Sequence, residues 1–345
     1  MRQCVAFGRN EIWSGREWST VTPEEAGLEP SRLVQASAYA GGAGMVVRAG
    51  QVAFAWGDTT AVYHIQSATK SIGAIALGLA IADKRIHIDD PAVRHHLSLG
   101  VPPEANRETG WLDRITVRHL ATMTAGFAKD GGYTGLLFQP GTMWAYSDGG
   151  ANWLGECLTL AYRRDLAALL AERVFRPLGI RPEELIWRDN AYRADRIQSV
   201  KRREIGAGIS ASAGALARIG LLFLAGGRWG QEQILPADYV EELRTTAAGQ
   251  ACLTVIHDPL ERFGGASAHY GLLWWNNADG AVPGVPRDAY WAWGLGDSII
   301  LVIPSLGLCA SRVGTSFPGE RKPSYCRVLE PFFAPIASAA GFRGG

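Results

Sequence analysis

The 345-residue sequence is poor in cysteine, in net charge and in long apolar runs. Its five cysteines are scattered without close pairs, and their odd number argues against a disulfide framework or a zinc knuckle, so we expect reduced thiols. The formal net charge is only +1, which provides no field to gather nucleic acid or anionic lipid. The longest apolar run, Ile72 to Ala82, is too short to cross a bilayer. These absences predict a soluble globular protein without nucleic-acid or membrane partners.

Signals for secretion and for several enzyme classes are also missing. The amino terminus, "MRQCVAFGRNEIWSG", lacks the apolar region and cleavage site of a secretory signal, as a processed start also would, and we expect a cytoplasmic protein. No Gly-x-Ser-x-Gly elbow occurs, which argues against an α/β-hydrolase. The "GDSI" at Gly296–Ile299 mimics a GDSL lipase, but no histidine follows His269 to complete that arrangement. The adjacent His95 and His96 lack a second ligand pair, so we expect neither a metal nor a cofactor.

Alternating apolar residues predict a β-hairpin near each end of the chain. Gly44–Gly57 fits two strands around an Ala-Gly-Gln turn, and Ser298–Val313 repeats the pattern. Helical segments at Pro30–Tyr39 and Tyr325–Ala340 flank these hairpins, and apolar residues between them recur at helical spacings of three and four. We predict an α+β fold, in which an antiparallel sheet flanked by terminal helices carries an inserted, mostly helical domain.

This arrangement divides the chain into two predicted domains. The sheet domain comprises residues 1–90 and 236–345, and the helical domain comprises residues 91–235. No internal repeat or low-complexity tract interrupts either part. We expect a functional site between the two domains.

The stretch "HIQSATKSIGAIALGLAIADK" places Ser67 and Lys70 three residues apart at the start of an apolar helical segment. Residues at this spacing share one helix face, so the Lys70 amine can reach the Ser67 hydroxyl. A lysine has an ordinary pKa of about 10.4, but burial at the positive end of a helix disfavours the ammonium and frees the amine as a base. Backbone amides at that helix end could also help to hold an oxyanion. The alternative is that Ser67 is a helix N-cap and Lys70 a solvated first-turn residue.

A second stretch, "FQPGTMWAYSDGGANWLGECL", presents Tyr146 and Asp148 between a Pro-Gly turn and a helix. A tyrosine that faces a serine–lysine pair can pass a proton between nucleophile and leaving group, and a neighbouring cation favours its phenolate form. Without such a pair, Tyr146 would be an ordinary half-buried aromatic residue. Trp144, Trp274, Trp275, Trp291 and Trp293 are expected in the core taken one at a time, although Trp144 and Trp293 flank the predicted site.

Together, these stretches resemble the serine β-lactamase and penicillin-binding protein superfamily, most strongly its class C and family VIII esterase branch. The similar phrases include "HIQSATKSIGAIALGLA", "ITVRHLATMTAGF", "PGTMWAYSDGGANWLGE" and "FRPLGI", and they run from about Val46 to Val313 in the expected order. The resemblance implies that Ser67 is the acylated nucleophile, Lys70 its base partner and Tyr146 the tyrosine of a Tyr-x-Asn element.

Two departures from the family pattern bear on the substrate. Asp148 stands where the family usually has asparagine, so an amide donor toward a substrate carbonyl is replaced by an acceptor. The Lys-Thr-Gly element is missing, and "AYWAWGLGDSIILVIP" in its place resembles the Trp-Gly-Gly or His-x-Gly variants of esterase-like members. The alignment puts Trp293, Gly294 and Leu295 there, and it offers the amide of Gly296 as a second oxyanion donor.

The resemblance implies a cofactor-free serine hydrolase that acts through an acyl-enzyme on a small-molecule ester or amide. Esters of small or apolar acids are the favoured substrates, because the groups that would recognise a β-lactam are replaced. One alternative is an amidase, a D-amino-acid peptidase or a weak β-lactamase. Another is a catalytically idle binding or sensor protein on the same fold.

Overall fold

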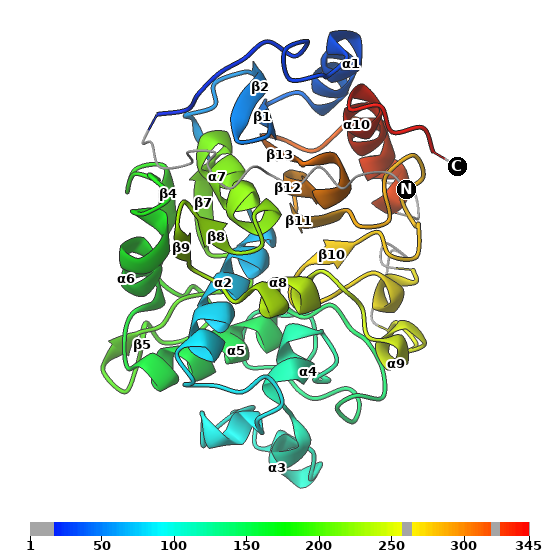
Figure 1. Ribbon diagram of the computed structural model, residues 1–345. Coiled ribbons are helices and arrows are strands. Elements are labelled where there is room, and N and C mark those ends of the chain that lie inside the picture. Colours follow the sequence, from blue (N-terminus) through cyan, green and yellow to red (C-terminus); the bar gives the residue numbers. More distant parts are fainter. Residues whose placement is uncertain (1–16, 257–263, 319–324, 345) are drawn as a thin grey trace.

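A computed structural model describes residues 17–256, 264–318 and 325–344 (Figure 1). The amino-terminal stretch on which the expected cytoplasmic location rests lies, with Cys4, outside these residues. Six of the described strands form an antiparallel sheet, and they come from both ends of the chain, as predicted. In spatial order they are β10 (Trp275–Asn276), β11 (Tyr290–Gly294), β12 (Ser298–Ile303), β13 (Leu308–Val313), β1 (Ala43–Arg48) and β2 (Gln51–Trp56).

Both predicted hairpins lie within this sheet. Strands β1 and β2 are joined by Ala49 and Gly50, which have positive φ angles of 48° and 81°. Two left-handed residues make the tight turn whose twist matches that of paired strands. Strands β12 and β13 pair from Ile299↔Arg312 to Ile303↔Leu308. The predicted α+β fold is therefore confirmed.

Helices cover both faces of the sheet (Figure 1). On one face, a Cβ added to Gly220 of α7 would lie 2.9 Å from Ile300 of β12. On the other, Phe333 of α10 makes an edge contact with Trp291 of β11. Ile300 pairs with Ala292, the neighbour of Trp291, so strand alternation puts the two contacts on opposite faces. The covering helices are α7 (Ala213–Leu224) and the terminal pair α1 (Pro30–Ala40) and α10 (Tyr325–Ala339).

The helix α2 (Ala68–Ala82) runs through the centre of the molecule, between the sheet and α5 (Asp148–Tyr162) (Figure 1). It is rich in alanine, leucine and isoleucine, which suits both a helix and a buried position. A small second sheet flanks it, with β3 (Val62–His64), β7 (Ile209–Ser212) and β4 (Leu185–Trp187) in that order. The predicted domain boundaries stay a prediction, and α7, which precedes residue 236, packs against the large sheet.

Shorter elements complete the fold. The helices are α3 (Ala105–Glu108), α4 (Val117–Ala121), α6 (Leu166–Leu170), α8 (Ala237–Leu243) and α9 (Ala248–Ala251). Two further hairpins pair β5 (Arg196–Ile197) with β6 (Val200–Lys201) and β8 (Arg228–Trp229) with β9 (Glu232–Gln233). Among the residues that the structure describes, no helix is both long and apolar enough to cross a bilayer. The cytoplasmic location stays a prediction.

A buried charge cluster fastens α5 to the segment that follows β4. The Glu156 carboxylate lies 2.6 Å from a guanidinium nitrogen of Arg193, 3.1 Å from one of Arg202 and 2.9 Å from the His96 ring. The four side chains are at most 8% exposed. Burial would raise the pKa of Glu156, but hydrogen bonding to His96 and the two guanidinium groups hold it below its usual value. The carboxylate therefore serves as the counter-charge of two buried cations.

Candidate active site

A cavity of about 210 Å³ opens where the amino-terminal ends of α2 and α5 approach the carboxyl end of β11. Six of the residues that the sequence predicted for the site line it: Ser67, Tyr146, Asp148, Trp293, Gly294 and Leu295. A seventh, Lys70, lies beneath them and is 1% exposed. Residues far apart in the sequence are thus brought together around one serine.

Ser67 precedes the first residue of α2, and its side chain makes no capping hydrogen bond. The hydroxyl is instead an acceptor for the Lys70 amine, with Nζ 3.2 Å from Oγ. The residue before it, Gln66, has a φ of 51°, a left-handed conformation that is costly for a side chain of this kind. The backbone therefore bends sharply just before Ser67, and the hydroxyl faces the cavity rather than the helix.

Lys70 is held by three oxygen atoms. Besides Ser67, its Nζ donates to the Gly206 carbonyl oxygen at 2.8 Å and to the Asp148 carboxylate. Burial lowers the pKa of Lys70 below its ordinary value, although the charges of Asp148 and Glu204 act in the opposite direction. Lowering this pKa favours the neutral amine, which is the form that can accept a proton.

Tyr146 hydrogen-bonds Ser67 through its side chain, and its ring stacks on Trp275 with centroids 5.7 Å apart. The Lys70 Nζ lies 4.7 Å from the ring centroid. Burial, reinforced by the charge of Asp148, nevertheless raises the pKa of Tyr146 well above its ordinary value. The expected phenolate is therefore disfavoured, because the cost of burying a charged oxygen outweighs the pull of Lys129 and the hydrogen bond from Ser67. The phenol keeps its proton.

Asp148 is the first residue of α5, and its carboxylate accepts hydrogen bonds from both Lys70 and Lys129. Burial would raise its pKa, but the two ammonium groups hold the pKa below its usual value. The side chain is 19% exposed. Asp148 is thus an ionised, doubly paired carboxylate rather than a free acceptor pointing at a substrate.

Strand β11 forms one side of the cavity, and its end lies very close to the segment before α2. A Cβ added to Gly294 would lie only 1.9 Å from the Ile65 carbonyl oxygen and 3.0 Å from the Ala68 amide nitrogen. The lack of a side chain therefore lets the strand end approach the segment that carries Ser67. Next to it, the Trp293 indole nitrogen donates to Asp297 at 2.9 Å, which fixes the ring at the cavity wall.

Two residues predicted for the site lie elsewhere. Trp144 is fully buried behind the cavity, where its ring contacts Tyr270. Its backbone pairs with Val255 in an isolated bridge, which holds it in the core. Gly296 is not among the residues that line the cavity, and its carbonyl oxygen accepts from Arg312 at 2.6 Å.

Five lining residues were not predicted: Gln66, Lys129, Tyr192, Ala207 and Trp275. Trp275 belongs to a cluster of tryptophans that the sequence assigned to the core, and only packing decides which of them reaches the cavity. Lys129 lies two residues after the "TMTAGF" phrase of the family resemblance. Its closeness to that phrase was the signal by which the sequence could have indicated it as a site residue. Within the described ranges no group of three or more His, Cys, Asp or Glu side chains could hold a metal ion.

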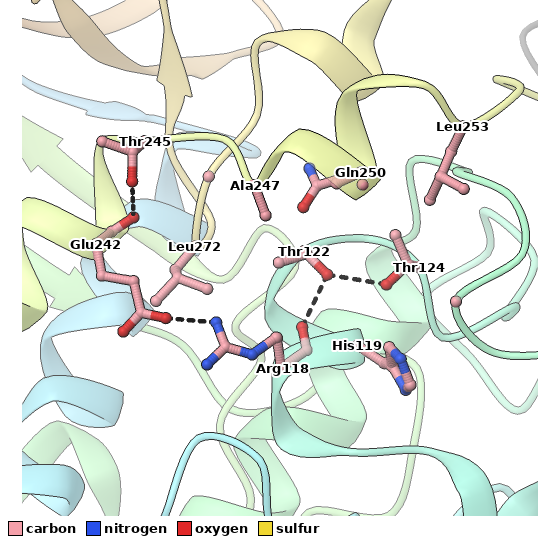
Figure 2. Close-up of a pocket in the computed structure, with 13 residues that line it drawn as sticks. Arg118, His119, Thr122, Thr124, Glu242, Thr245, Ala247, Gln250, Leu253 and Leu272 are labelled. Carbon is pink, nitrogen blue, oxygen red and sulfur yellow. Dashed lines mark hydrogen bonds and ion pairs between the residues drawn. The ribbon is translucent and has the colours of Figure 1, made fainter.

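A second cavity, of about 270 Å³, lies between α4, α8 and α9 (Figure 2). Its polar side chains already have partners: Arg118 binds Glu242, and the Thr122 hydroxyl bonds Thr124 and the Arg118 carbonyl oxygen. It includes none of the residues around Ser67. The candidate active site is therefore the cavity at the start of α2.

Comparisons with known proteins find solved structures of the same fold. Similar crystal structures include a β-lactamase from Mycobacterium bovis, with 20% identity and a TM-score of 0.63 over 87% of this chain and 93% of that one. A penicillin-binding protein homologue from Caulobacter crescentus has 15% identity and a TM-score of 0.66 over 93% and 99% of the two chains. EstCE1, a hydrolase with promiscuous acyltransferase activity, has 16% identity and a TM-score of 0.63 over 92% and 98%.

At such identities these structures show a shared fold. Among curated proteins, no significant match was found. The family model described as Beta-lactamase, however, matches residues 31–329, which is most of the chain. The predicted resemblance is confirmed: the chain belongs to the β-lactamase family, whose members are generally serine hydrolases.

Proposed function

We propose that the protein is a serine hydrolase that forms an acyl-enzyme on Ser67. The observation that carries this proposal is the position of the Lys70 amine, 3.2 Å from the Ser67 hydroxyl and almost completely buried. A buried amine of lowered pKa within hydrogen-bond reach is what a serine needs as a general base.

The reaction would run in two halves. Lys70 takes the Ser67 proton as Oγ attacks the substrate carbonyl, and the resulting ammonium returns a proton to the leaving alkoxide. The Tyr146 phenol, which bonds Ser67, relays this proton in a concerted step: it gives its own proton to the leaving alkoxide as it takes the one from the Lys70 ammonium. Water then attacks the acyl-enzyme with Lys70 again as base, which releases the acid and restores Ser67.

For the oxyanion, we propose the amide of Ser67 and that of Leu295, in place of Gly296. The Asn277 amide donates to the Ala289 carbonyl, so residue 289 faces the β10 side of β11. Amides alternate along a strand, and continuing this alternation one residue past β11 turns the Leu295 amide to the same edge. The Gly296 carbonyl, by contrast, bonds Arg312.

Esters of small or apolar acids are the substrates that we propose. The cavity is small, and Trp275, Trp293, Leu295 and Tyr192 give it an apolar rim, with Leu295 56% and Tyr192 49% exposed. The names of similar structures include a hydrolase with acyltransferase activity and a 6-aminohexanoate-dimer hydrolase. An amidase, a D-amino-acid peptidase or a weak β-lactamase is therefore the second candidate.

The test is covalent labelling with a fluorophosphonate, together with hydrolysis of p-nitrophenyl butyrate. Wild type should label and hydrolyse, and Ser67→Ala should do neither, because the attacking oxygen is gone. Ser98→Ala is the matched control: this exposed serine lies outside the cavity and should leave both readouts unchanged. Wild-type labelling in Ser67→Ala would move the nucleophile elsewhere. An unlabelled, inactive wild type would favour the idle binding protein.

A further inference from the structure

The Asp148 carboxylate lies between the side chains of two lysines. Its Oδ1 accepts from the Lys70 Nζ, and its Oδ2 accepts from the Lys129 Nζ. Lys70 is 1% exposed and lies below the carboxylate, whereas Lys129 is 48% exposed and faces the cavity. Each carboxylate oxygen thus serves a different cation.

A lone carboxylate at this place would oppose catalysis. An opposite charge in contact with an amine raises its pKa by about one to three units, which keeps the amine protonated and unable to act as a base. The asparagine usual in this family would give Lys70 an acceptor without a charge. Asp148 keeps the acceptor, so its charge has to be compensated by another group.

We infer that Lys129 is that group, a positioning residue whose ammonium neutralises Asp148 so that Lys70 can act as a base. The Asp148–Lys129 ion pair then presents to Lys70 what a neutral amide would present, an acceptor oxygen without net charge. This inference rests on the proposed function, because it concerns the base that activates Ser67.

The loop around Lys129 is built onto the start of α5 rather than resting on the surface. The Lys129 carbonyl accepts from the Asp148 amide at 3.1 Å, and the Ala128 carbonyl accepts from the Ser147 hydroxyl at 2.7 Å. A Cβ on Gly149 would lie 2.6 Å from the Asp130 carbonyl oxygen, so helix and loop touch there. Residues 128, 129 and 130 are thus all held against the start of α5. This fixes the backbone of Lys129 next to Asp148, within reach of its ammonium.

The other charges that face Lys70 are already balanced. Glu204 acts on Lys70 from the segment before β7, but its carboxylate lies 2.9 Å from the Arg188 guanidinium. Tyr146 is neutral, because burial raises the pKa of its phenol. Asp148 is thus the charge that acts on Lys70 most directly, and Lys129 is its partner on the cavity side.

The test compares the pH dependence of kcat/KM for p-nitrophenyl butyrate in wild type and Lys129→Met. Without Lys129 the full charge of Asp148 acts on Lys70 and raises its pKa, so the rising limb should move to higher pH by about one unit or more. Lys129→Arg, which keeps the charge, should hold the limb at its wild-type position. Lys84→Met, an exposed lysine outside the cavity, is the control for the loss of a positive charge and should change nothing.

The double variant Lys129→Met/Asp148→Asn distinguishes this role from a structural one. Removing both charges should return the limb to within about half a unit of wild type, because a neutral acceptor again faces Lys70. An unmoved limb in Lys129→Met, or a shift that persists in the double variant, would overturn the inference while Ser67 still labels with fluorophosphonate. Failure of wild-type Ser67 to label would overturn the proposed function and the inference with it.

Discussion

The close approach of β11 to the Ser67 segment gives a prediction whose size follows from the structure. In Gly294→Ala the new Cβ would lie 1.9 Å from the Ile65 carbonyl oxygen and 3.0 Å from the Ala68 amide nitrogen. Carbon and oxygen atoms do not approach so closely, so the strand end has to retreat by about 1 Å or more. A displacement of this size should lower the rate about a hundredfold, which is ~2.7 kcal/mol of transition-state stabilisation, because the oxyanion donors must keep their position relative to the nucleophile.

The assay is kcat/KM for p-nitrophenyl butyrate, with the thermal midpoint measured in parallel. The overpacked variant should also lose about 1–3 kcal/mol of stability, which still leaves a folded protein to assay. Gly249→Ala is the matched control, because a Cβ there meets nothing within 4 Å and the backbone is not left-handed. A folded Gly294→Ala with kcat/KM within threefold of wild type would refute the idea that this contact sets the geometry of the site.

The base, the missing cation and the buried charge cluster each give a further prediction. Lys70→Arg should retain less than a tenth of wild-type kcat/KM, because a guanidinium does not release its proton. If it retains more, the loss of transition-state stabilisation is below ~1.4 kcal/mol, and Lys70 is not the base. Wild-type kcat/KM for p-nitrophenyl butyrate should exceed that for nitrocefin by at least about a hundredfold. The reason is that Trp293, in place of the lysine of the Lys-Thr-Gly element, offers no charge to the lactam carboxylate. Comparable values for the two substrates would contradict the ester preference. Glu156→Ala should lower the free energy of unfolding in urea by about 3–5 kcal/mol, because Arg193 and Arg202 lose their counter-charge; a loss under about 1 kcal/mol would show that the cluster does not stabilise the fold.

The proximity of Ser67 and Lys70 could be predicted because it is local. Three residues along a helix bring two side chains onto one face wherever that helix lies in the fold. The hairpins at Gly44–Gly57 and Ser298–Val313 were equally accessible, since alternation and turn residues are written in short stretches of sequence. The position of Tyr146 could be inferred from the family resemblance.

Contacts that depend on tertiary packing could not be predicted in this way. Whether Trp144 or Trp275 reaches the cavity is decided by a backbone bridge to Val255, which draws Trp144 into the core. The pairing of Lys129 with Asp148 joins two segments 19 residues apart through a loop whose course no periodicity indicates. The protonated state of Tyr146 depends on its burial, which no local pattern measures.

Most of α2 is buried, from Ala68 through Ala80, so the serine and its amine are attached to one of the best protected segments of the molecule. Amide hydrogens of such a helix exchange through large openings of the fold rather than local fraying. Loss of activity in denaturant should therefore coincide with global unfolding. Substitutions along α2 are also constrained during evolution, because a change in this buried helix disturbs the packing of the core. New substrates are more readily accommodated by exchanging the side chains of Tyr192 and Leu295, which lie on separate loops at the rim.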